Sequence, residues 1–260
     1  MTDIAKLLQH ARRSGVPVEL APEHRPGTLT AAYDAADRLH ALRGGAAKGW
    51  KIGATSPGAR TALGVAAPIF GRIYADGVVF SPHVAAPDPR PVVLDAEWIV
   101  EIGDGDAFGP DRGAVDRAVR AVRPGLEINH PWLADPFGSG AYAIIADNAA
   151  HAGLVVGQTV LAGGLGGAAE QRVALFLDGE RVAEGSAAEA GFDPYEALIE
   201  LARHLHERGA RLREGDLISA GAVLAPLEIG PEGGAVTVEF GGAGAIKAAF
   251  PARPAARRSS

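Results

Sequence analysis

The chain contains, at residues 92–102, the stretch VVLDAEWIVEI, in which apolar and other residues alternate. Such alternation indicates a β-strand, because successive side chains of a strand point to opposite faces. One face is apolar and carries Val92, Leu94, Ala96, Trp98 and Val100. The other face carries Asp95, Glu97 and Glu101.

Two interpretations of this acidic face remain open. It is either the solvated side of a half-buried antiparallel strand, or part of a site for a hard divalent cation. Asp95 and Glu97 lie one pleat apart, so both could reach one ion. A durable site needs a third carboxylate. Glu127 is the candidate, because it lies in the next β-type run, LEIN, after an intervening helix.

Lys51 lies among apolar residues in the segment GWKIGATS. A lysine in this setting usually extends its ammonium group to solvent. If it were instead partly buried beside a metal site, it would carry a proton or stabilise an enolate. The sequence leaves both possibilities open.

The chain divides into three regions that differ in the secondary structure their sequence pattern predicts. Residues 1–48 are expected to form a small helical N-terminal region, with one helix near residues 4–11 and a second that begins at Thr30. Residues 49–250 are expected to form a β-rich domain, and residues 251–260 a disordered tail. The fold class predicted from this pattern is a mixed, β-rich α+β fold.

Two helices and one hairpin are predicted within the β-rich region. The first helix covers Gly113–Val122 and is stopped by Pro124. The second begins after the N-cap Asp193 and ends at Gly209. The pair Asp178-Gly179 separates two β-type runs, which is a strong signal for a tight hairpin.

Composition excludes several functional classes. The chain has 260 residues, a formal net charge of −6 and no cysteine. The acidic balance argues against sequence-independent binding of nucleic acid. The lack of cysteine excludes disulfides, thiolate metal ligands and cysteine nucleophiles, so any metal must be held by oxygen or imidazole ligands. No signal peptide and no membrane-spanning stretch is recognisable, and we expect a cytoplasmic protein without a membrane partner.

Five segments in order resemble those of one family. They are GWKIGATSPGARTALGV, PIFGRIYAD, LDAEWIVEIG, GLEIN and IADNAAHAGLVVG. Together they resemble the 2-keto-4-pentenoate hydratase and 4-oxalocrotonate decarboxylase family, within the fumarylacetoacetate hydrolase superfamily. The resemblance implies a fumarylacetoacetate hydrolase-type fold, and it covers most of the chain.

The resemblance also implies roles for individual residues. It places the family's Mg²⁺ or Mn²⁺ ligands on Asp95, Glu97 and Glu127. It implies that Lys51 and Asp76 are catalytic, with Asp76 orienting the lysine or activating water. It further implies that Ser56 and Asn148 contact the substrate. The residues concerned lie in the five matching segments.

Three departures from the family pattern stand out. The leading metal carboxylate is Asp95 rather than glutamate, and the serine that hydratases carry after ADNA is Ala150, followed by His151. The third concerns the His and Glu with which C–C hydrolases of the superfamily activate water. Glu23-His24 is the only candidate pair before Asp95, and we interpret it as a solvated loop.

The resemblance implies a divalent-metal-dependent hydratase that adds water to a 2-hydroxydienoate or 2-oxo-enoate such as 2-keto-4-pentenoate. It also implies a homo-oligomer that acts on a small 2-oxo acid in the catabolism of aromatic compounds. Three alternatives remain. They are a decarboxylase of 4-oxalocrotonate-type acids, a fumarylacetoacetate hydrolase-like C–C bond hydrolase, and a non-catalytic binding protein with the same fold.

Overall fold

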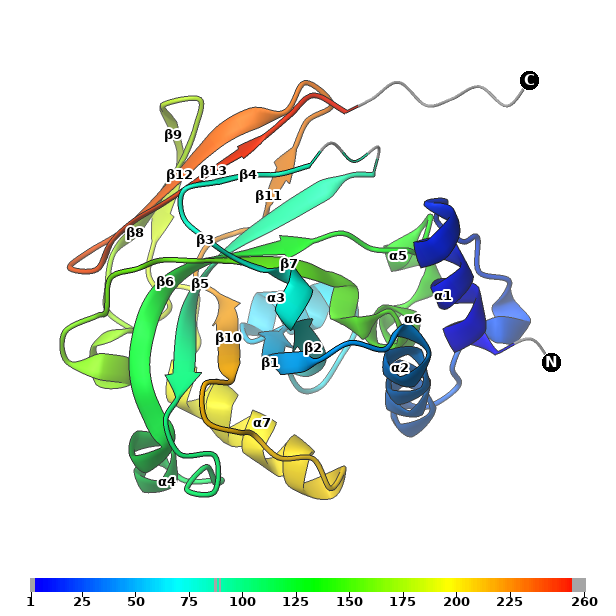
Figure 1. Ribbon diagram of the computed structural model, residues 1–260, viewed down its shortest axis with the longest axis horizontal. Coiled ribbons are helices and arrows are strands. Elements are labelled where there is room, and N and C mark those ends of the chain that lie inside the picture. The colour runs from blue at the N-terminus through cyan, green and yellow to red at the C-terminus, as the bar shows by residue number, and fades with distance from the viewer. Residues whose placement is uncertain (1–2, 87, 89, 254–260) are drawn as a thin grey trace.

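The computed structural model describes residues 3–86, 88 and 90–253, which fold into two β-sheets with helices around them (Figure 1). The larger sheet has eight strands, ordered β2-β1-β10-β5-β6-β7-β3, with β11 also paired to β5. Its strands are β1 Ala47–Gly53, β2 Ile69–Tyr74, β3 Val78–Phe80, β5 Val92–Ile102, β6 Val119–Asn129, β7 His151–Val156, β10 Leu217–Ala222 and β11 Leu227–Ile229.

The second sheet has five strands, ordered β4-β13-β12-β8-β9, and lies above the first in Figure 1. Its strands are β4 His83–Val84, β8 Val173–Leu177, β9 Glu180–Gly185, β12 Gly234–Phe240 and β13 Gly244–Phe250. The predicted hairpin is confirmed, because Asp178 and Gly179 alone connect β8 to β9, both with positive φ. This combination of sheets and helices confirms the predicted α+β class.

The α-helices are α1 Ile4–Ser14, α2 Leu29–Arg43, α3 Pro57–Leu63, α4 Arg112–Ala118, α5 Pro136–Ser139, α6 Ala141–Ala146 and α7 Pro194–Glu207. Figure 1 shows α1, α2, α5 and α6 to the right of the larger sheet and α4 and α7 below it. Short 3₁₀ turns are η1 Pro22–His24, η2 Ala75–Gly77, η3 Asn148–Ala150 and η4 Gly164–Gly167.

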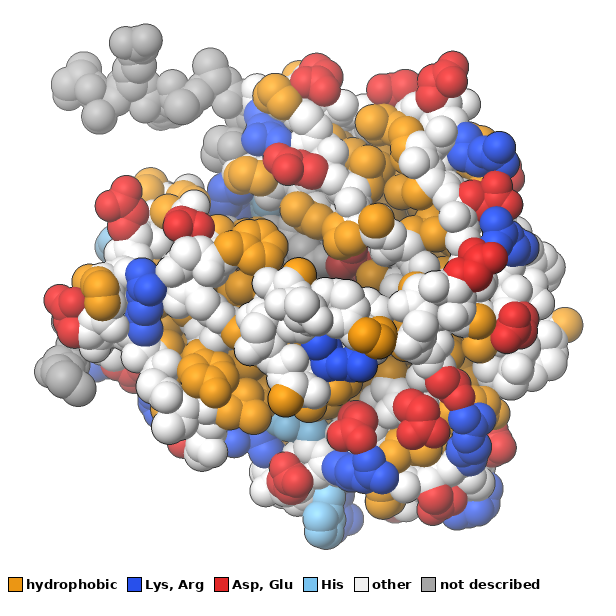
Figure 2. All heavy atoms as spheres, turned by 180° about the vertical axis from the view of Figure 1, so that it is seen from behind, with side chains coloured by type: hydrophobic (Ala, Val, Ile, Leu, Met, Phe, Trp, Pro, Cys, Tyr) orange, Lys and Arg blue, Asp and Glu red, His pale blue; other side chains and the backbone are white. Residues whose placement is uncertain are grey.

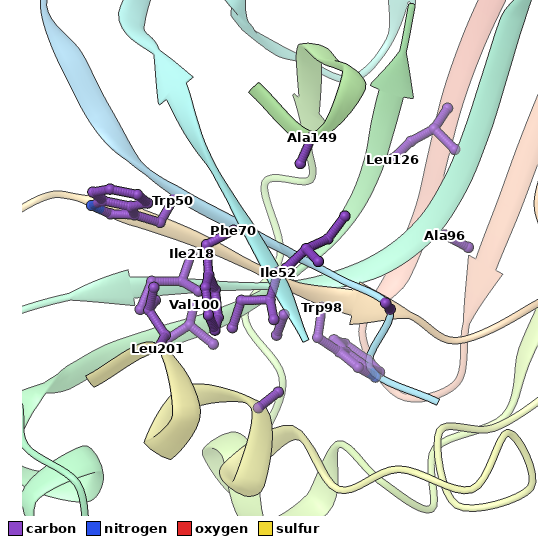
Figure 3. Packing of buried hydrophobic residues seen from close by; sticks show 14 of the residues in the cluster. Trp50, Ile52, Phe70, Ala96, Trp98, Val100, Leu126, Ala149, Leu201 and Ile218 are labelled. Atoms are coloured by element: carbon purple, nitrogen blue, oxygen red, sulfur yellow. The ribbon is translucent and has the colours of Figure 1, made fainter. Parts of the chain in front are cut away.

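The apolar face of β5 packs into the main core, as its alternation predicts. Leu94, Ala96, Trp98 and Val100 are all at most 3% exposed. Figure 3 shows Val100 beside Ile218 of β10 and Leu201 of α7. The helix therefore covers this face of the larger sheet.

The opposite face of the sheet carries a smaller apolar cluster, formed by Ile73, Ile99, Leu154, Val156 and Leu217. The sheet curls, since its edge strand β2 also contacts β7 on the far side of β6. This curled inner face also carries the acidic residues of β5, because Ile99 follows Glu97 by one pleat. Asp95 and Glu97 therefore lie on the inner side of the curled sheet.

The helical N-terminal region forms as expected, with one correction to its second helix. The N-cap of α2 is Thr28, whose hydroxyl accepts a hydrogen bond from Ala31 N–H, rather than Thr30. Helices α1 and α2 pack on each other, and α2 also packs on α6. The domain boundary near residue 48 stays a prediction.

The helix predicted at Gly113–Val122 is shorter than expected. It covers Arg112–Ala118, and Val119 already begins β6. Pro124 lies inside this strand, opposite Trp98, instead of ending the helix. Valines at a helical spacing also suit a strand, so the pattern did not separate the two.

The second predicted helix, α7, is confirmed. It begins after Asp193, whose side chain accepts a hydrogen bond from Tyr195 N–H, and its last residue is Glu207. Among the described residues, none of the helices is long and apolar enough to cross a membrane. Of the predicted tail, residues 254–260 lie outside the described part. Arg253 N–H donates a hydrogen bond to the carbonyl of Pro231.

Candidate metal and catalytic site

The three carboxylates predicted as metal ligands lie together on the inner face of the larger sheet. Asp95 of β5 is directly opposite Glu127 of β6, and Glu97 follows Asp95 by one pleat. One ligand oxygen from each of the three lies within 4.8 Å of those of the other two. The register of the β5–β6 pair therefore builds the cluster.

Glu97 is held by the end of β10. Its Oε2 accepts hydrogen bonds from the Ser219 hydroxyl and, at 2.9 Å, from Gly221 N–H. Gly221 has φ +111°, and a Cβ there would lie 2.5 Å from the Thr55 side chain, so glycine is required. Glu97 is only 1% exposed, which rules out a solvated acidic face at this position.

Lys51 of β1 completes the cluster. Its Nζ lies 3.3 Å from Glu127 Oε2, and the residue is 4% exposed. The solvent-extended interpretation of Lys51 is therefore wrong. Burial alone would lower the pKa of Lys51, but the charges of Glu127, Glu97 and Asp95 outweigh burial and raise it. The ammonium group is thus held in its charged form.

The carboxylates respond differently to this environment. The pKa of Asp95 is raised to about 7 by burial and by the charge of Glu127. The pKa of Glu97 is raised well above its usual value by burial and by the charges of Glu127 and Asp95. Burial would also raise the pKa of Glu127, but Lys51 and His151 outweigh it and lower that pKa. Glu127 is the carboxylate that stays ionised beside the lysine.

The cluster fits a hard divalent cation. With all three acids ionised, Lys51 leaves two negative charges uncompensated, and buried charge of this kind is costly without a counter-ion. Asp95 Oδ1 is buried and has no hydrogen-bond partner among the described residues. Carboxylate oxygens are the ligands that Mg²⁺ and Mn²⁺ prefer. A buried carboxylate oxygen without a hydrogen-bond partner is available as a ligand for such an ion.

The side-chain amide of Asn129 contacts two of the three carboxylates. Its Nδ2 donates to Asp95 Oδ2 at 2.8 Å and lies 3.4 Å from Glu127 Oε2. Asn129 is not among the site residues predicted from the sequence, although it lies two residues after Glu127 on the same strand face. The two-residue spacing between Glu127 and Asn129 could have indicated that both side chains face the site.

His151 is a second site residue that was not predicted as one; in the sequence it stands out only as a departure from the family pattern. Its Nδ1 lies 2.7 Å from Glu127 Oε1, with both side chains at most 1% exposed. His151 faces Asn129 because the β6–β7 register shifts between Ile128 and Asn129. Such a bulge moves a side chain to the other face, so alternation alone would place His151 away from the site.

The structure does not bring Asp76 to this cluster. Asp76 lies in η2, beyond the end of β2 that pairs with Ala47, whereas Lys51 pairs with Gly71. Its exposed carboxylate accepts hydrogen bonds from Arg43 Nη2 at 2.8 and 2.9 Å. The predicted contact between Asp76 and Lys51 is therefore absent.

Asn148 and Ser56 both have structural partners. The amide group of Asn148 bonds both backbone groups of Arg72: Oδ1 accepts from N–H at 2.7 Å and Nδ2 donates to the carbonyl at 2.9 Å. The Ser56 hydroxyl accepts from Ala59 N–H at 3.2 Å and caps α3. Both ends of the Asn148 amide are therefore bonded to Arg72 and the residue is 3% exposed, while the substrate contacts of Asn148 and Ser56 stay predictions.

The pair Glu23-His24 lies in the short η1 turn, with Glu23 exposed. This agrees with its interpretation as a loop. Charged side chains of both signs are also intermixed on the face of the molecule shown in Figure 2. The acidic excess is not gathered into one patch there.

The chain is similar over nearly its whole length to curated hydratases. It is 29% identical to "2-keto-4-pentenoate hydratase" of Paraburkholderia xenovorans (strain LB400), over 95% of this chain and 94% of that protein. It is 28% identical to "TodF product hydratase" of Pseudomonas putida (strain F1), over 95% and 93% of the two chains. No protein-family model matches the chain.

Solved structures share the fold. The 4-oxalocrotonate decarboxylase from Pseudomonas putida G7, complexed with magnesium and adipate, superposes with a TM-score of 0.79. That match is 24% identical and covers 95% of this chain and 97% of the other. Fumarylpyruvate hydrolase from Pseudomonas aeruginosa, in complex with Mn²⁺ and pyruvate, matches with a TM-score of 0.56 and 16% identity, over 78% and 89% of the chains.

These structural matches confirm the expected fumarylacetoacetate hydrolase-type fold, and the full-length matches to hydratases agree with the five sequence segments that led to it. The chain is thus similar over nearly its whole length to proteins named 2-keto-4-pentenoate hydratase, and it shares its fold with 4-oxalocrotonate decarboxylase and fumarylpyruvate hydrolase.

Proposed function

We propose that the protein is a divalent-metal-dependent hydro-lyase that adds water to a 2-hydroxydienoate or 2-oxo-enoate such as 2-keto-4-pentenoate. Full-length similarity to proteins named as hydratases supports the reaction class. The observation that carries the proposal is the buried cluster of three carboxylates with Lys51 against Glu127.

In this proposal Asp95, Glu97 and Glu127 hold Mg²⁺ or Mn²⁺. The two oxygens of the substrate's 2-oxo-carboxylate end would chelate such an ion, whose positive charge would stabilise negative charge on the C2 oxygen. Asp95 is half-buried as a residue, but its Oδ1 is buried and has no hydrogen-bond partner among the described residues, which leaves that oxygen available to such an ion.

Lys51 supplies the second positive charge at this site. Its buried ammonium group holds a proton at Nζ, beside Glu127 Oε2. It can stabilise the enolate or deliver a proton as water adds across the substrate's double bond. Because Asp76 lies elsewhere, orientation of Lys51 falls to Glu127.

The test is a substrate panel with product identification. A 2-hydroxydienoate and a 2-oxo-3-enedioate are supplied to protein stripped with EDTA, with and without added Mg²⁺ or Mn²⁺. We expect metal-dependent loss of the dienoate and formation of the hydrated 4-hydroxy-2-oxo acid, identified by NMR.

The same panel separates the alternatives. Release of CO₂ from the enedioate would assign the chain as a decarboxylase, because the same enolate forms when CO₂ leaves. An acylpyruvate supplied under the same conditions tests the third reaction, because its cleavage into two acids would indicate a C–C hydrolase. Absence of both turnover and metal binding would leave a binding protein and overturn the proposal.

Asp95 gives a prediction about metal affinity. Aspartate is one methylene shorter than glutamate, and Mg²⁺ demands near-ideal geometry at about 2.0–2.1 Å. We expect weak metal binding in the free protein that tightens with oxalate, which supplies two oxygens. Asp95→Glu is expected to tighten binding without oxalate on the order of tenfold, about 1.4 kcal/mol.

Calorimetric titration with Mn²⁺, with and without oxalate, measures both effects. Asp95→Asn keeps the size of the side chain but removes its charge, and we expect it to weaken Mn²⁺ binding. If the free protein binds Mn²⁺ tightly and Asp95→Asn changes nothing, Asp95 is not a ligand. A cytoplasmic location and a homo-oligomeric state stay predictions from the sequence.

A further inference from the structure

His151 is delivered to the site by an unusual stretch of backbone. The three residues before it, Asn148, Ala149 and Ala150, have φ values of 57°, 50° and 63°. None is glycine, and a left-handed conformation costs free energy at each such residue. A strained turn of this kind persists only where its surroundings hold it in place.

Two sets of contacts hold the turn. The Asn148 amide pairs with both backbone groups of Arg72, and His130 N–H donates to the Ala150 carbonyl at 2.9 Å. Beyond His151, the bulge at Ala152 then sets the register of β7. The strained turn and the bulge together aim the His151 ring at the inner face of the sheet.

The contact that results is specific. A carboxylate oxygen only accepts hydrogen bonds, so His151 Nδ1–H is the donor to Glu127 Oε1 at 2.7 Å. His151 Nε2 is buried and has no partner among the described residues. Glu127 is therefore the one hydrogen-bond partner that the described structure gives the ring.

This bond fixes how Glu127 presents its other oxygen. With Oε1 engaged by His151, Oε2 is directed toward Lys51 at 3.3 Å and Asn129 at 3.4 Å. Without the donor, the carboxylate could rotate about its last torsion, which is broad and weakly restricted. A ligand that rotates freely is a poorer ligand.

We propose that His151 is a positioning residue that locks the Glu127 carboxylate, through Nδ1–H, in the orientation needed to bind the divalent cation. The inference rests on the proposed function, since it gives Glu127 the role of metal ligand. Residues that hydrogen-bond a metal-ligating carboxylate typically contribute about 10- to 100-fold to metal affinity.

The test compares His151→Leu with His151→Asn by calorimetric titration of EDTA-stripped protein with Mn²⁺. The two side chains have nearly the same shape, but only asparagine carries an N–H donor near the position of Nδ1. We expect His151→Leu to weaken Mn²⁺ binding about 10- to 100-fold and His151→Asn to stay close to the native protein.

A buried histidine outside the site provides the control. His204 stacks on Phe70, with ring centroids 4.5 Å apart, and contacts Tyr33 rather than the carboxylates. His204→Leu is expected to change the melting temperature without changing Mn²⁺ affinity. If His151→Leu does not fold, His151→Ala takes its place in the comparison with His151→Asn.

The outcomes separate this inference from the proposed function. Native protein that binds no Mn²⁺, even with oxalate, overturns the proposed function and the role of His151 with it. Native binding that His151→Leu leaves unchanged overturns only the inference. So does an equal loss in His151→Leu and His151→Asn, because the donor would then not be what matters.

Discussion

Replacing Lys51 with methionine is expected to lower turnover at least about 100-fold, the usual scale for a positioned proton-transfer group. Methionine keeps most of the length and volume of lysine but removes the charge that lies 3.3 Å from Glu127. Affinity for Mn²⁺ is expected to rise or stay unchanged, because a cation that competes with the metal for Glu127 is lost.

Steady-state kinetics on the best substrate of the panel measures the first effect, and calorimetric titration the second. Lys48→Met is the matched control, since Lys48 lies on the same strand but belongs to none of the ion pairs found among the described residues. Native-like turnover of Lys51→Met, with Lys48→Met also active, would contradict the role of Lys51.

The strand that carries the acidic residues was predictable because its two faces differ in chemistry. Val92–Ile102 forms the strand that its alternation indicates, and helix α7 begins directly after its predicted N-cap, Asp193. Both rest on local rules, namely period-two patterning and N-capping. The start of β6 was missed because valines spaced as in a helix also satisfy a strand.

The candidate site was only partly predictable, because its remaining members depend on irregular backbone. His151 reaches Glu127 through three left-handed residues and a bulge, neither of which follows from residue types such as Ala149. The Asn148 amide supports the strained turn through Arg72, a role that residue type did not indicate, and its predicted contact with substrate stays a prediction. Asp76 was placed by resemblance, and a partner far along the chain, Arg43, binds its carboxylate.

These differences share a physical cause. A period of two fixes which face a strand residue occupies only while the register is regular. The shifts beside Asn129 and between Ser219 and Ala222 occur next to the carboxylates. They turn His151 toward Glu127 and bring Gly221 N–H to Glu97. The irregular positions are thus concentrated where the site is built.

Glu127 is expected to be the most sensitive metal ligand, because it is the carboxylate whose pKa is lowered rather than raised. Glu127→Gln keeps the volume and removes the charge. At an effective dielectric constant of about 20, unit charges about 4 Å apart interact by about 4 kcal/mol. Part of this is offset by the desolvation that the charged group no longer suffers, so we expect Mn²⁺ affinity to fall at least about 100-fold.

The amide also conflicts with its neighbours. Glutamine can still accept from His151 Nδ1–H through its oxygen, but its NH₂ group then faces the Lys51 ammonium and the Asn129 amide, which are both donors. We therefore expect a lower melting temperature together with an unchanged far-UV spectrum. Glu101→Gln is the matched control. Glu101 lies on the face of β5 that carries Asp95 and Glu97, but its carboxylate pairs with Arg123. If Glu127→Gln binds Mn²⁺ as tightly as Glu101→Gln does, Glu127 holds no metal and serves only as the counter-charge of Lys51.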